Sequence, residues 1–209
     1  MTSNGVKRPW DVFFEDKMRR IFSAKRVVDI GGGLRINKEK NNRYDASREW
    51  LIPLAARIDY KILDKVADYN PDIVGDIHKL PFVDDSEEAI ICIAVLEHVE
   101  DPALAMREIY RVLKPGGMVF IYVPFLYYYH AHGGYYKDFW RFTKDGLAHL
   151  AKDFSLFEII GVRGPVETLI RLSPLGRWKV MCTLGFMLDK MTGKLESNQV
   201  SGYNVFLVK

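Results

Sequence analysis

One continuous segment near the middle of the chain constrains the fold most, because it combines a strand, a helix and a second strand. Residues 88–96 (EAIICIAVL) and 118–125 (MVFIYVPF) are apolar and rich in β-branched side chains, as in strands that are buried on both faces. Residues 101–113 (DPALAMREIYRVL) have the apolar spacing of an amphipathic helix, and Asp101 is suited to cap its start. This order predicts a parallel βαβ unit.

The same alternation continues on both sides of this unit. Outside it the sequence predicts one helix, at residues 10–22, and four strands, at residues 26–30, 58–64, 154–162 and 203–209. The predicted fold class is therefore α/β: a Rossmann-like, mostly parallel sheet with helices on both faces, in a single domain over residues 1–209. Ligands of such sheets bind beyond the carboxyl ends of the strands, so we expect functional residues directly after each strand.

The composition narrows the class of protein. The net charge of +3 is too small to indicate a nucleic-acid-binding protein. No stretch of 18 apolar residues could span a bilayer, and the opening segment has acidic residues where a signal peptide has an apolar core. Cys92 and Cys182 are expected to be reduced thiols, and no CxxC or HExxH spacing predicts a metal site. We therefore expect a cytoplasmic protein without a nucleic-acid partner.

Three features after the predicted strands suit a nucleotide-like ligand. Residues 27–35 (VVDIGGGLR) place a glycine-rich turn after the first strand, where the backbone can turn sharply and approach a ligand. Asp64 ends the next strand, where an acid can accept hydrogen bonds from ribose hydroxyls. Asp76 follows, where its carboxylate could meet an adenine edge while Ile77 packs on the ring. Each feature alone also fits an ordinary turn or a solvated loop.

The order of these motifs resembles the class I S-adenosylmethionine-dependent methyltransferases in their type 11 form. The resemblance covers about residues 25–125 and depends on the whole run DIGGG, LD, GDIHKLPF, AVLEHVEDP, RVLKPGG and VPF. It implies a seven-stranded sheet with one antiparallel strand, and S-adenosyl-L-methionine as the cofactor. Carried over to this chain, it assigns the cofactor site as follows: Asp29, Gly31, Gly32 and Gly33 against the methionine end, Asp64 on the ribose, Asp76 and Ile77 on the adenine, and Ala94 beside the sulfonium.

The chain departs from the family pattern in two places. Arg35 stands where the glycine-rich loop usually has a third glycine, and Gly33 and Asp64 are 31 positions apart, where a dinucleotide fold has about 20. The longer gap argues against the rival interpretation, an NAD-dependent dehydrogenase. That interpretation also offers no role for the LPF, LEHVEDP and KPGG motifs.

The segment that follows the strand at 118–125 is unusually aromatic. Residues 120–142 contain 11 of the 27 aromatic residues of the chain, together with His130 and His132. Polar and charged side chains interleave with the rings, which favours the wall of a ligand pocket over a core segment. Residues 123–143 (VPFLYYYHAHGGYYKDFWRFT) also resemble a segment, VPF…YxxH…DYWRFT, of methyltransferases associated with polysaccharide and cell-surface glycan biosynthesis. That resemblance implies a sugar or a sugar-linked acceptor.

Methylation of an alcohol needs a base, and a histidine near its ordinary pKa is well suited to this role. His130, His98 and His132 are the candidates, in that order. Asp138 is expected to orient a histidine, and Arg141 either grips an anionic acceptor or pairs with Asp138. The other two histidines of the chain, His78 and His149, are expected to be surface or helix residues.

A late insertion separates the last two predicted strands, which such sheets usually join by a short turn. Residues 166–191 are apolar with basic flanks, and we expect a helical insertion over residues 166–199. Three interpretations stay open: a cap over the acceptor pocket, a peripheral contact with an anionic membrane surface, or a dimer contact. The oligomeric state is not predicted.

The sequence thus predicts a methyltransferase that uses S-adenosyl-L-methionine to methylate an oxygen of a sugar, a nucleotide-sugar or a lipid-linked glycan. Two alternatives remain. The acceptor could be another small metabolite, such as a phenol or a quinone precursor, or the chain could be an inactive binding protein that keeps the cofactor fold. The intact glycines and the acids at 64 and 76 speak against the inactive protein.

Overall fold

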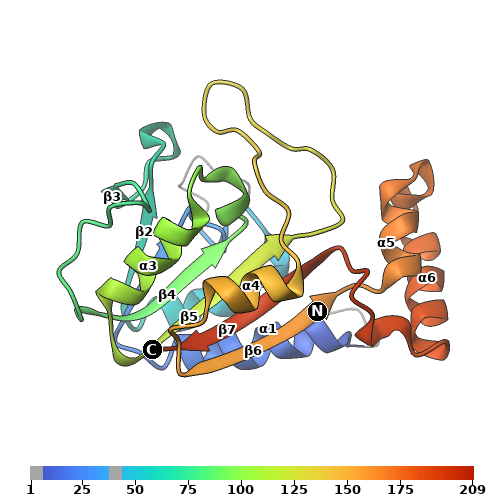
Figure 1. Cartoon of the computed structure of the whole chain (residues 1–209), viewed down its shortest axis with the longest axis horizontal. Helices are drawn as coiled ribbons and strands as arrows, with labels where there is room; N and C mark the ends of the chain where they lie inside the picture. Colours follow the sequence, from blue (N-terminus) through green and yellow to red (C-terminus); the bar gives the residue numbers. More distant parts are fainter. Residues whose placement is uncertain (1–6, 38–43) are drawn as a thin grey trace.

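Seven strands form one mixed sheet in a computed structural model that describes residues 7–37 and 44–209 (Figure 1). The strand order is β3-β2-β1-β4-β5-β7-β6, and only β7 runs antiparallel to its neighbours. The strands are β1 (Arg26–Ile30), β2 (Asp59–Asp64), β3 (Ile73–Val74), β4 (Glu87–Ile93), β5 (Leu113–Pro124), β6 (Leu156–Val162) and β7 (Gly202–Val208). This sheet confirms the predicted fold class.

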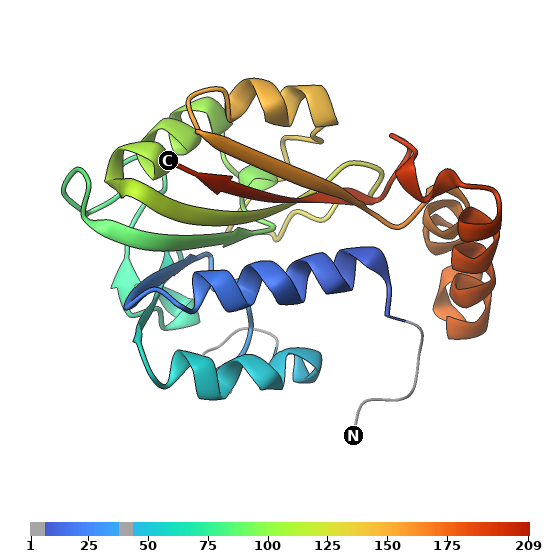
Figure 2. The same cartoon turned by 90° about the horizontal axis from the view of Figure 1, so that it is seen from below.

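Helices cover both faces of the sheet (Figure 2). On one face lie α3 (Pro102–Val112) and α4 (Lys144–Leu150); on the other lie α1 (Pro9–Ile21), η1 (Ala46–Leu51) and the short α2 (Ile52–Ala55). Helix α3 buries Ala105, Met106, Ile109 and Val112, the one apolar face that its sequence offers. As predicted, the Asp101 carboxylate caps this helix by accepting a hydrogen bond from the Leu104 amide, at 2.8 Å.

Strand boundaries in the central unit differ from the prediction, and one strand was not predicted. Strand β5 begins at Leu113 rather than at residue 118. Strand β4 ends at Ile93 rather than at residue 96, because Ala94 adopts a left-handed backbone conformation (φ 54°) that no strand can continue. The chain then forms a short turn, η3 (Leu96–His98). The seventh strand, β3, has only two residues, too few for any periodicity in the sequence to predict it.

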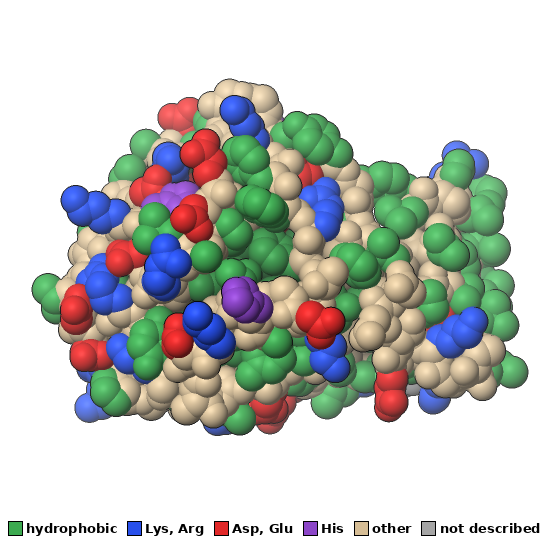
Figure 3. Space-filling model, in the orientation of Figure 1, with side chains coloured by type: hydrophobic (Ala, Val, Ile, Leu, Met, Phe, Trp, Pro, Cys, Tyr) green, Lys and Arg blue, Asp and Glu red, His purple; other side chains and the backbone are tan. Residues whose placement is uncertain are grey.

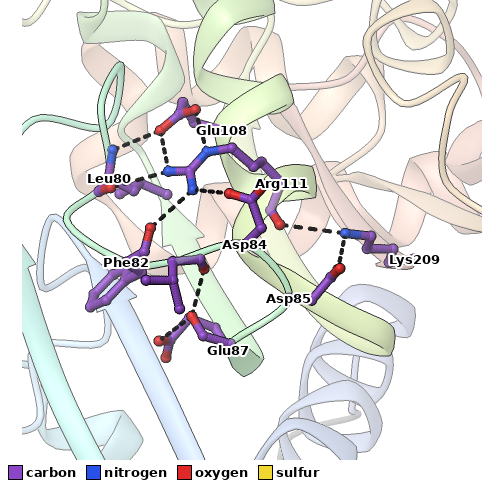
Figure 4. A network of polar contacts seen from close by, with 10 residues as sticks. Leu80, Phe82, Asp84, Asp85, Glu87, Glu108, Arg111 and Lys209 are labelled. Atoms are coloured by element: carbon purple, nitrogen blue, oxygen red, sulfur yellow. Dashed lines mark hydrogen bonds and ion pairs between the residues drawn. The ribbon is translucent and has the colours of Figure 1, made fainter.

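A network around Arg111 of α3 explains much of the family motif between residues 80 and 113 (Figure 4). The guanidinium pairs with Glu108 at 2.7 Å and Asp84 at 2.7 Å, and it donates to the Phe82 carbonyl at 2.9 Å. Glu108 in turn accepts from the Leu80 amide at 2.9 Å. These contacts fix the LPF loop against α3, so this part of the motif supports the fold rather than a ligand.

The predicted insertion is a pair of helices between β6 and β7, beside the end of the sheet (Figures 1 and 2). It comprises α5 (Pro165–Leu172), η4 (Pro174–Arg177), α6 (Lys179–Met191) and η5 (Lys194–Glu196). The buried Glu167 carboxylate pairs with Arg8 at 2.6 Å, and the Trp10 and Phe186 rings meet edge to face at 5.7 Å. The insertion is therefore tied to the start of α1. Among the described residues, no helix has the length and apolar character needed to cross a membrane.

Candidate functional site

A crevice runs along the carboxyl ends of β1, β2, β4 and β5, where the fold predicts a ligand. Its volume of about 2440 Å³ exceeds that of a single small-molecule site, ~300–1000 Å³. The crevice therefore has room for two ligands side by side. The glycine turn, Asp64 and Asp76 all line it, so the three features predicted from the sequence converge on one site.

The glycine turn is shaped by close contacts with neighbouring strands. Gly31 and Gly32 have left-handed backbones (φ 77° and 57°), and the Gly31 amide donates to the Leu63 carbonyl at 2.7 Å. A Cβ on Gly33 would lie 2.6 Å from the Ile93 carbonyl oxygen. Arg35, at the position of the missing third glycine, also takes a left-handed backbone (φ 56°). The turn thus keeps its tight shape without that glycine, at the cost of strain at Arg35.

Asp29 supports this turn from beneath, which corrects the prediction that it lies against the cofactor. Its carboxylate is fully buried and accepts hydrogen bonds from the Gly33 and Leu34 amides at 3.1 Å and from the Tyr60 hydroxyl at 2.6 Å. Burial raises the pKa of Asp29 to about 6, against the lowering effect of these hydrogen bonds. Because every bond goes to the protein, Asp29 positions the loop.

Asp64 lies at the end of β2 with its carboxylate at the crevice wall. Its Oδ1 accepts a hydrogen bond from the Val66 amide at 2.8 Å, which fixes the side chain. Burial raises the pKa of this carboxyl above its ordinary value. An acid held in this place suits two adjacent ribose hydroxyls, and the contact with a ribose stays a prediction.

Asp76 is held by partners on both sides. Its Oδ2 pairs with Lys65 Nζ at 2.7 Å, and its Oδ1 accepts from the amide of His78 at 2.9 Å. Although burial opposes the effect, the hydrogen bonds from Lys65 and His78 lower the pKa of Asp76 to about 2. His78 also contacts Asp76 through Nδ1 at 2.8 Å, so it supports the site rather than being the surface residue that we predicted.

The other two predicted cofactor residues differ in how far they reach the crevice. Ile77 is only 4% exposed and packs mainly in the core, so its side chain has little surface left for an adenine ring. Ala94 lines the crevice, and its amide donates to the Tyr122 carbonyl at 2.9 Å. That bond joins the ends of β4 and β5 beneath the expected sulfonium position.

The aromatic segment forms the opposite wall as a long loop without regular structure, residues 125–142 (Figure 1). Several of its rings are exposed, including Tyr127, Tyr128, Tyr129 and Tyr135. The loop is anchored at η3, where the Glu97 carbonyl accepts from the Phe139 amide at 2.8 Å and the Trp140 amide at 3.2 Å. This arrangement agrees with the predicted pocket wall, because a core segment would bury these rings.

Two of the three candidate bases meet at one point, and the third lies apart. The rings of His98 and His130 are 4.8 Å apart, edge to face. Both approach the carboxylate of Glu97, a fully buried residue that the sequence reasoning missed. The signal for Glu97 in the sequence is its place beside His98 in the LEH motif, directly after a strand. Glu97 raises the pKa of His130, assisted by the Tyr128 carbonyl.

His132 instead bridges the crevice. Its Nδ1 lies 3.1 Å from the Tyr69 hydroxyl, and the Tyr135 hydroxyl donates to Asp68 at 3.0 Å. Both partners belong to the segment after β2, on the cofactor wall. The aromatic loop therefore reaches across the region between Asp64 and the acceptor side, and His132 serves this contact rather than the base position.

Arg141 pairs with Asp138 within the chain, which is one of the two roles that the sequence left open for it. The guanidinium makes two parallel bonds to the carboxylate, one of them 2.7 Å long, and donates to the Tyr128 carbonyl at 2.6 Å. Arg141 lowers the pKa of Asp138 to about 2. Asp138 also accepts from the His130 amide at 2.8 Å. Arg141 is thus engaged with the protein, and Asp138 orients His130.

The insertion forms an end wall of the crevice, where Thr168, Arg171 and Leu172 of α5 line it. The Tyr128 hydroxyl of the aromatic loop donates to the Arg171 carbonyl at 3.2 Å. Hydrophobic side chains gather on the outer edge of the helix pair, at the right of Figure 3; exposed ones include Leu169, Val180, Leu184, Met187, Leu188 and Met191. The predicted contact with anionic lipid stays a prediction.

Comparison with known proteins supports the predicted enzyme class. Residues 46–121 match the family model of a methyltransferase domain. Over 132 residues, the chain is 33% identical to the ubiquinone/menaquinone biosynthesis C-methyltransferase UbiE of Vibrio campbellii, a match that covers 58% of this chain and 49% of that protein. It is also 47% identical over 51 residues to a demethylmenaquinone methyltransferase of Streptomyces avermitilis, covering 24% and 22% of the two chains. The chain thus spans about half the length of the Vibrio relative.

Solved structures bear out the fold. A SAM-dependent methyltransferase from Archaeoglobus fulgidus superposes with a TM-score of 0.57 at 13% identity, covering 95% of this chain and 94% of that one. An S-adenosylmethionine-dependent methyltransferase from Mesorhizobium loti gives 0.53 at 14% identity, with 93% and 96% covered. The chain therefore has the Rossmann-like fold of these methyltransferases.

Proposed function

We propose that the chain is an S-adenosylmethionine-dependent methyltransferase that methylates a hydroxyl group of a small acceptor, of the sugar or lipid-linked glycan class. The observation that carries the proposal is the single crevice with two chemically different walls. One wall holds the glycine turn, Asp64 and Asp76; the other holds aromatic rings and two histidines.

The cofactor wall fits S-adenosylmethionine in the shape and chemistry of its own residues. The glycine turn leaves backbone free of side chains at the end of β1, where the methionine end would lie. Asp64 would accept hydrogen bonds from both ribose hydroxyls, and the segment at Asp76 would face the adenine. When bound, this cofactor supplies an electrophilic methyl group on a sulfonium, so the chemistry needs alignment above all.

The acceptor wall would orient the hydroxyl and take up its proton. Exposed tyrosine rings suit the apolar face of a sugar ring or another flat ring. His98 and His130 line the same crevice as Ala94, and neutral imidazole is a base near neutral pH. In the overall reaction the acceptor oxygen gains the methyl group, its proton passes to the protein or to water, and the carbon–sulfur bond breaks to leave a thioether.

A quinone precursor is the second candidate acceptor, and the names of the similar enzymes favour it. The Vibrio relative is a C-methyltransferase of ubiquinone and menaquinone biosynthesis, and the Streptomyces relative is a demethylmenaquinone methyltransferase. A ring hydroxyl of such a precursor would also need a base to activate its neighbouring carbon. The aromatic wall therefore suits both acceptors, and the product distinguishes them.

Cofactor binding tests the enzyme class directly. We expect S-adenosylhomocysteine to bind with micromolar affinity in a calorimetric titration. Asp64→Ala should weaken binding by about 100-fold, because it removes two charge-assisted hydrogen bonds of about 1.5 kcal/mol each. Asp153→Ala, an exposed acid outside the crevice, is the matched control and should bind normally. If the wild type releases no heat at millimolar ligand, the enzyme class is wrong, and the interpretation as an inactive binding protein is the one that remains.

Product analysis tests the acceptor. Isotope-labelled S-adenosylmethionine is incubated with a panel of nucleotide-sugars and lipid-linked saccharides, and in parallel with demethylmenaquinone and simple phenols. Fragmentation by mass spectrometry separates a methyl ether from a methyl group on ring carbon. Transfer only to ring carbon would overturn the glycan proposal in favour of the quinone candidate.

A further inference from the structure

The acceptor wall contains a buried carboxylate whose surroundings are unusual. Glu97 is fully buried, yet no hydrogen-bond donor among the described residues reaches either of its carboxylate oxygens. A buried charge without a partner is strongly unfavourable, and folded proteins normally satisfy it with a hydrogen bond, an opposite charge or a metal ion. The carboxylate of Glu97 therefore calls for a cation in the space that it faces.

Two imidazoles face the same space. His130 Nε2 lies 3.6 Å and His98 Nε2 lies 3.8 Å from Glu97 Oε1. Three potential ligand atoms, one from each of Glu97, His98 and His130, lie within 4.8 Å of one another. These distances are too long for direct hydrogen bonds, which end near 3.2 Å.

The hydrogen bonds on the far side of each ring fix its tautomer. His98 Nδ1 lies 2.7 Å from the Lys137 carbonyl oxygen, and His130 Nδ1 lies 3.0 Å from the Tyr128 carbonyl oxygen. A carbonyl oxygen only accepts, so both Nδ1 atoms carry the proton, and in the neutral rings both Nε2 atoms present a lone pair. Three electron-pair donors thus converge on one space, and no hydrogen-bond donor among the described residues reaches the Glu97 oxygens.

We propose that Glu97, His98 and His130 bind a divalent transition-metal ion of the zinc class. Two imidazoles and one carboxylate, with a position left for another ligand, are a known zinc-binding set. Metal–ligand bonds of about 2.1 Å in tetrahedral geometry place the ligand atoms ~3.4 Å apart, close to the two separations between Glu97 and the histidines, 3.6 Å and 3.8 Å. Metal-binding histidines typically donate their other N–H to a carbonyl or a carboxylate, as both do here.

The position of the site suggests what the ion would do, and this part rests on the proposed function. The three ligands line the crevice at the junction of its two walls, since His98 follows β4 and His130 belongs to the aromatic loop. An ion there would have an open position for an acceptor oxygen and would lower its pKa. With the ion bound, both Nε2 lone pairs would be engaged, so the acceptor proton would pass to water and not to an imidazole. Asp138, which accepts from the His130 amide, would then be a positioning residue.

Metal titration tests the site without reference to activity. Chelator-treated full-length protein is titrated with Zn²⁺ by calorimetry and with Co²⁺ by visible absorption. We expect one ion per chain with micromolar or tighter affinity, and a Co²⁺ spectrum typical of four or five ligands that include nitrogen. Glu97→Gln and His98→Ala should each weaken Zn²⁺ binding by at least about 10-fold.

The control is His149→Ala, which removes an exposed histidine of α4 and should leave the affinity unchanged. Should Glu97→Gln fail to fold, the partly exposed His98 and His130 supply alanine variants that test the same site. Absence of stoichiometric binding in the wild type, or equal binding in His149→Ala and the His98→Ala/His130→Ala double variant, overturns the proposal. S-adenosylhomocysteine binding is measured on the same samples, so failure of the metal site and failure of the methyltransferase assignment are distinguished.

Discussion

The two walls of the crevice satisfy their buried charges in opposite ways. On the cofactor wall, the buried Asp29 carboxylate accepts three hydrogen bonds from the protein itself. On the acceptor wall, the equally buried Glu97 has none among the described residues. The first wall is complete as folded, whereas the second needs something from outside the chain. The cofactor wall is therefore preformed, whereas the acceptor wall, in our proposal, is completed by a bound metal ion.

The largest expected effect tests how rigid the cofactor wall is. Gly33→Ala would place a Cβ 2.6 Å from the Ile93 carbonyl oxygen and Cβ, and both belong to a central strand that cannot move away. We expect a loss of about 3 kcal/mol in the free energy of unfolding, measured by urea denaturation, because overpacking of this kind shifts the backbone. Gly133→Ala, in the aromatic loop, meets nothing within 4 Å and should change the stability by less than about 0.5 kcal/mol. Equal losses would mean that the two walls do not differ in rigidity.

The two walls also differ in how well the sequence predicts them. The cofactor wall is formed by short segments directly after strands, so local motifs placed Gly31, Gly33 and Asp64 correctly. The acceptor wall depends on how a long irregular loop folds back over η3, and no periodicity encodes that path. The meeting of Glu97 with His130, 33 positions apart, is a tertiary contact and could not be read from spacing. Asp29 was misplaced because a motif gives a residue's position and not the direction of its side chain.

The pH dependence of the unfolding free energy tests how much the burial of the Asp29 carboxylate destabilises the cofactor wall. Its folded pKa of about 6 lies above the ordinary value of 3.8. The raised pKa means that its contribution to stability is complete below pH 3.8 and is lost as the pH rises through 6. At about 1.4 kcal/mol per pKa unit, the loss is on the order of 3 kcal/mol at most. We expect the unfolding free energy of the wild type to fall between pH 4 and pH 6.5 relative to that of Asp29→Asn.

An Asp153→Asn variant controls for the pH profile, because this exposed acid should follow the wild type. Parallel profiles for the wild type and Asp29→Asn would show that the three hydrogen bonds fully offset the burial of the charge.

The acceptor wall offers the same test on a second buried carboxylate, Glu97. In metal-free protein at a pH where His130 is neutral, Glu97→Gln removes a buried carboxylate that accepts no hydrogen bond from the described residues, so we expect it to raise the unfolding free energy by about 2 kcal/mol. The matched control is Glu87→Gln, since Glu87 is equally buried but pairs with Arg26 at 3.1 Å, and its loss should destabilise. Saturating Zn²⁺ should raise the melting temperature of the wild type and leave that of Glu97→Gln unchanged. A destabilised Glu97→Gln would instead indicate that the carboxylate is satisfied within the chain.

The smallest effect concerns Arg35, one of the two places where the cofactor wall departs from the pattern that the sequence resembles. Arg35 has a left-handed backbone (φ 56°) in the position of the usual third glycine, and a non-glycine residue there is strained. Arg35→Gly should relieve about 1 kcal/mol of strain, although the freer unfolded chain offsets part of this gain. Thermal unfolding should therefore show a small rise in melting temperature, and S-adenosylhomocysteine affinity should change less than threefold. A large loss of that affinity would mean that the Arg35 side chain itself contacts the cofactor. The arginine would then have a role in binding, which a glycine could not supply.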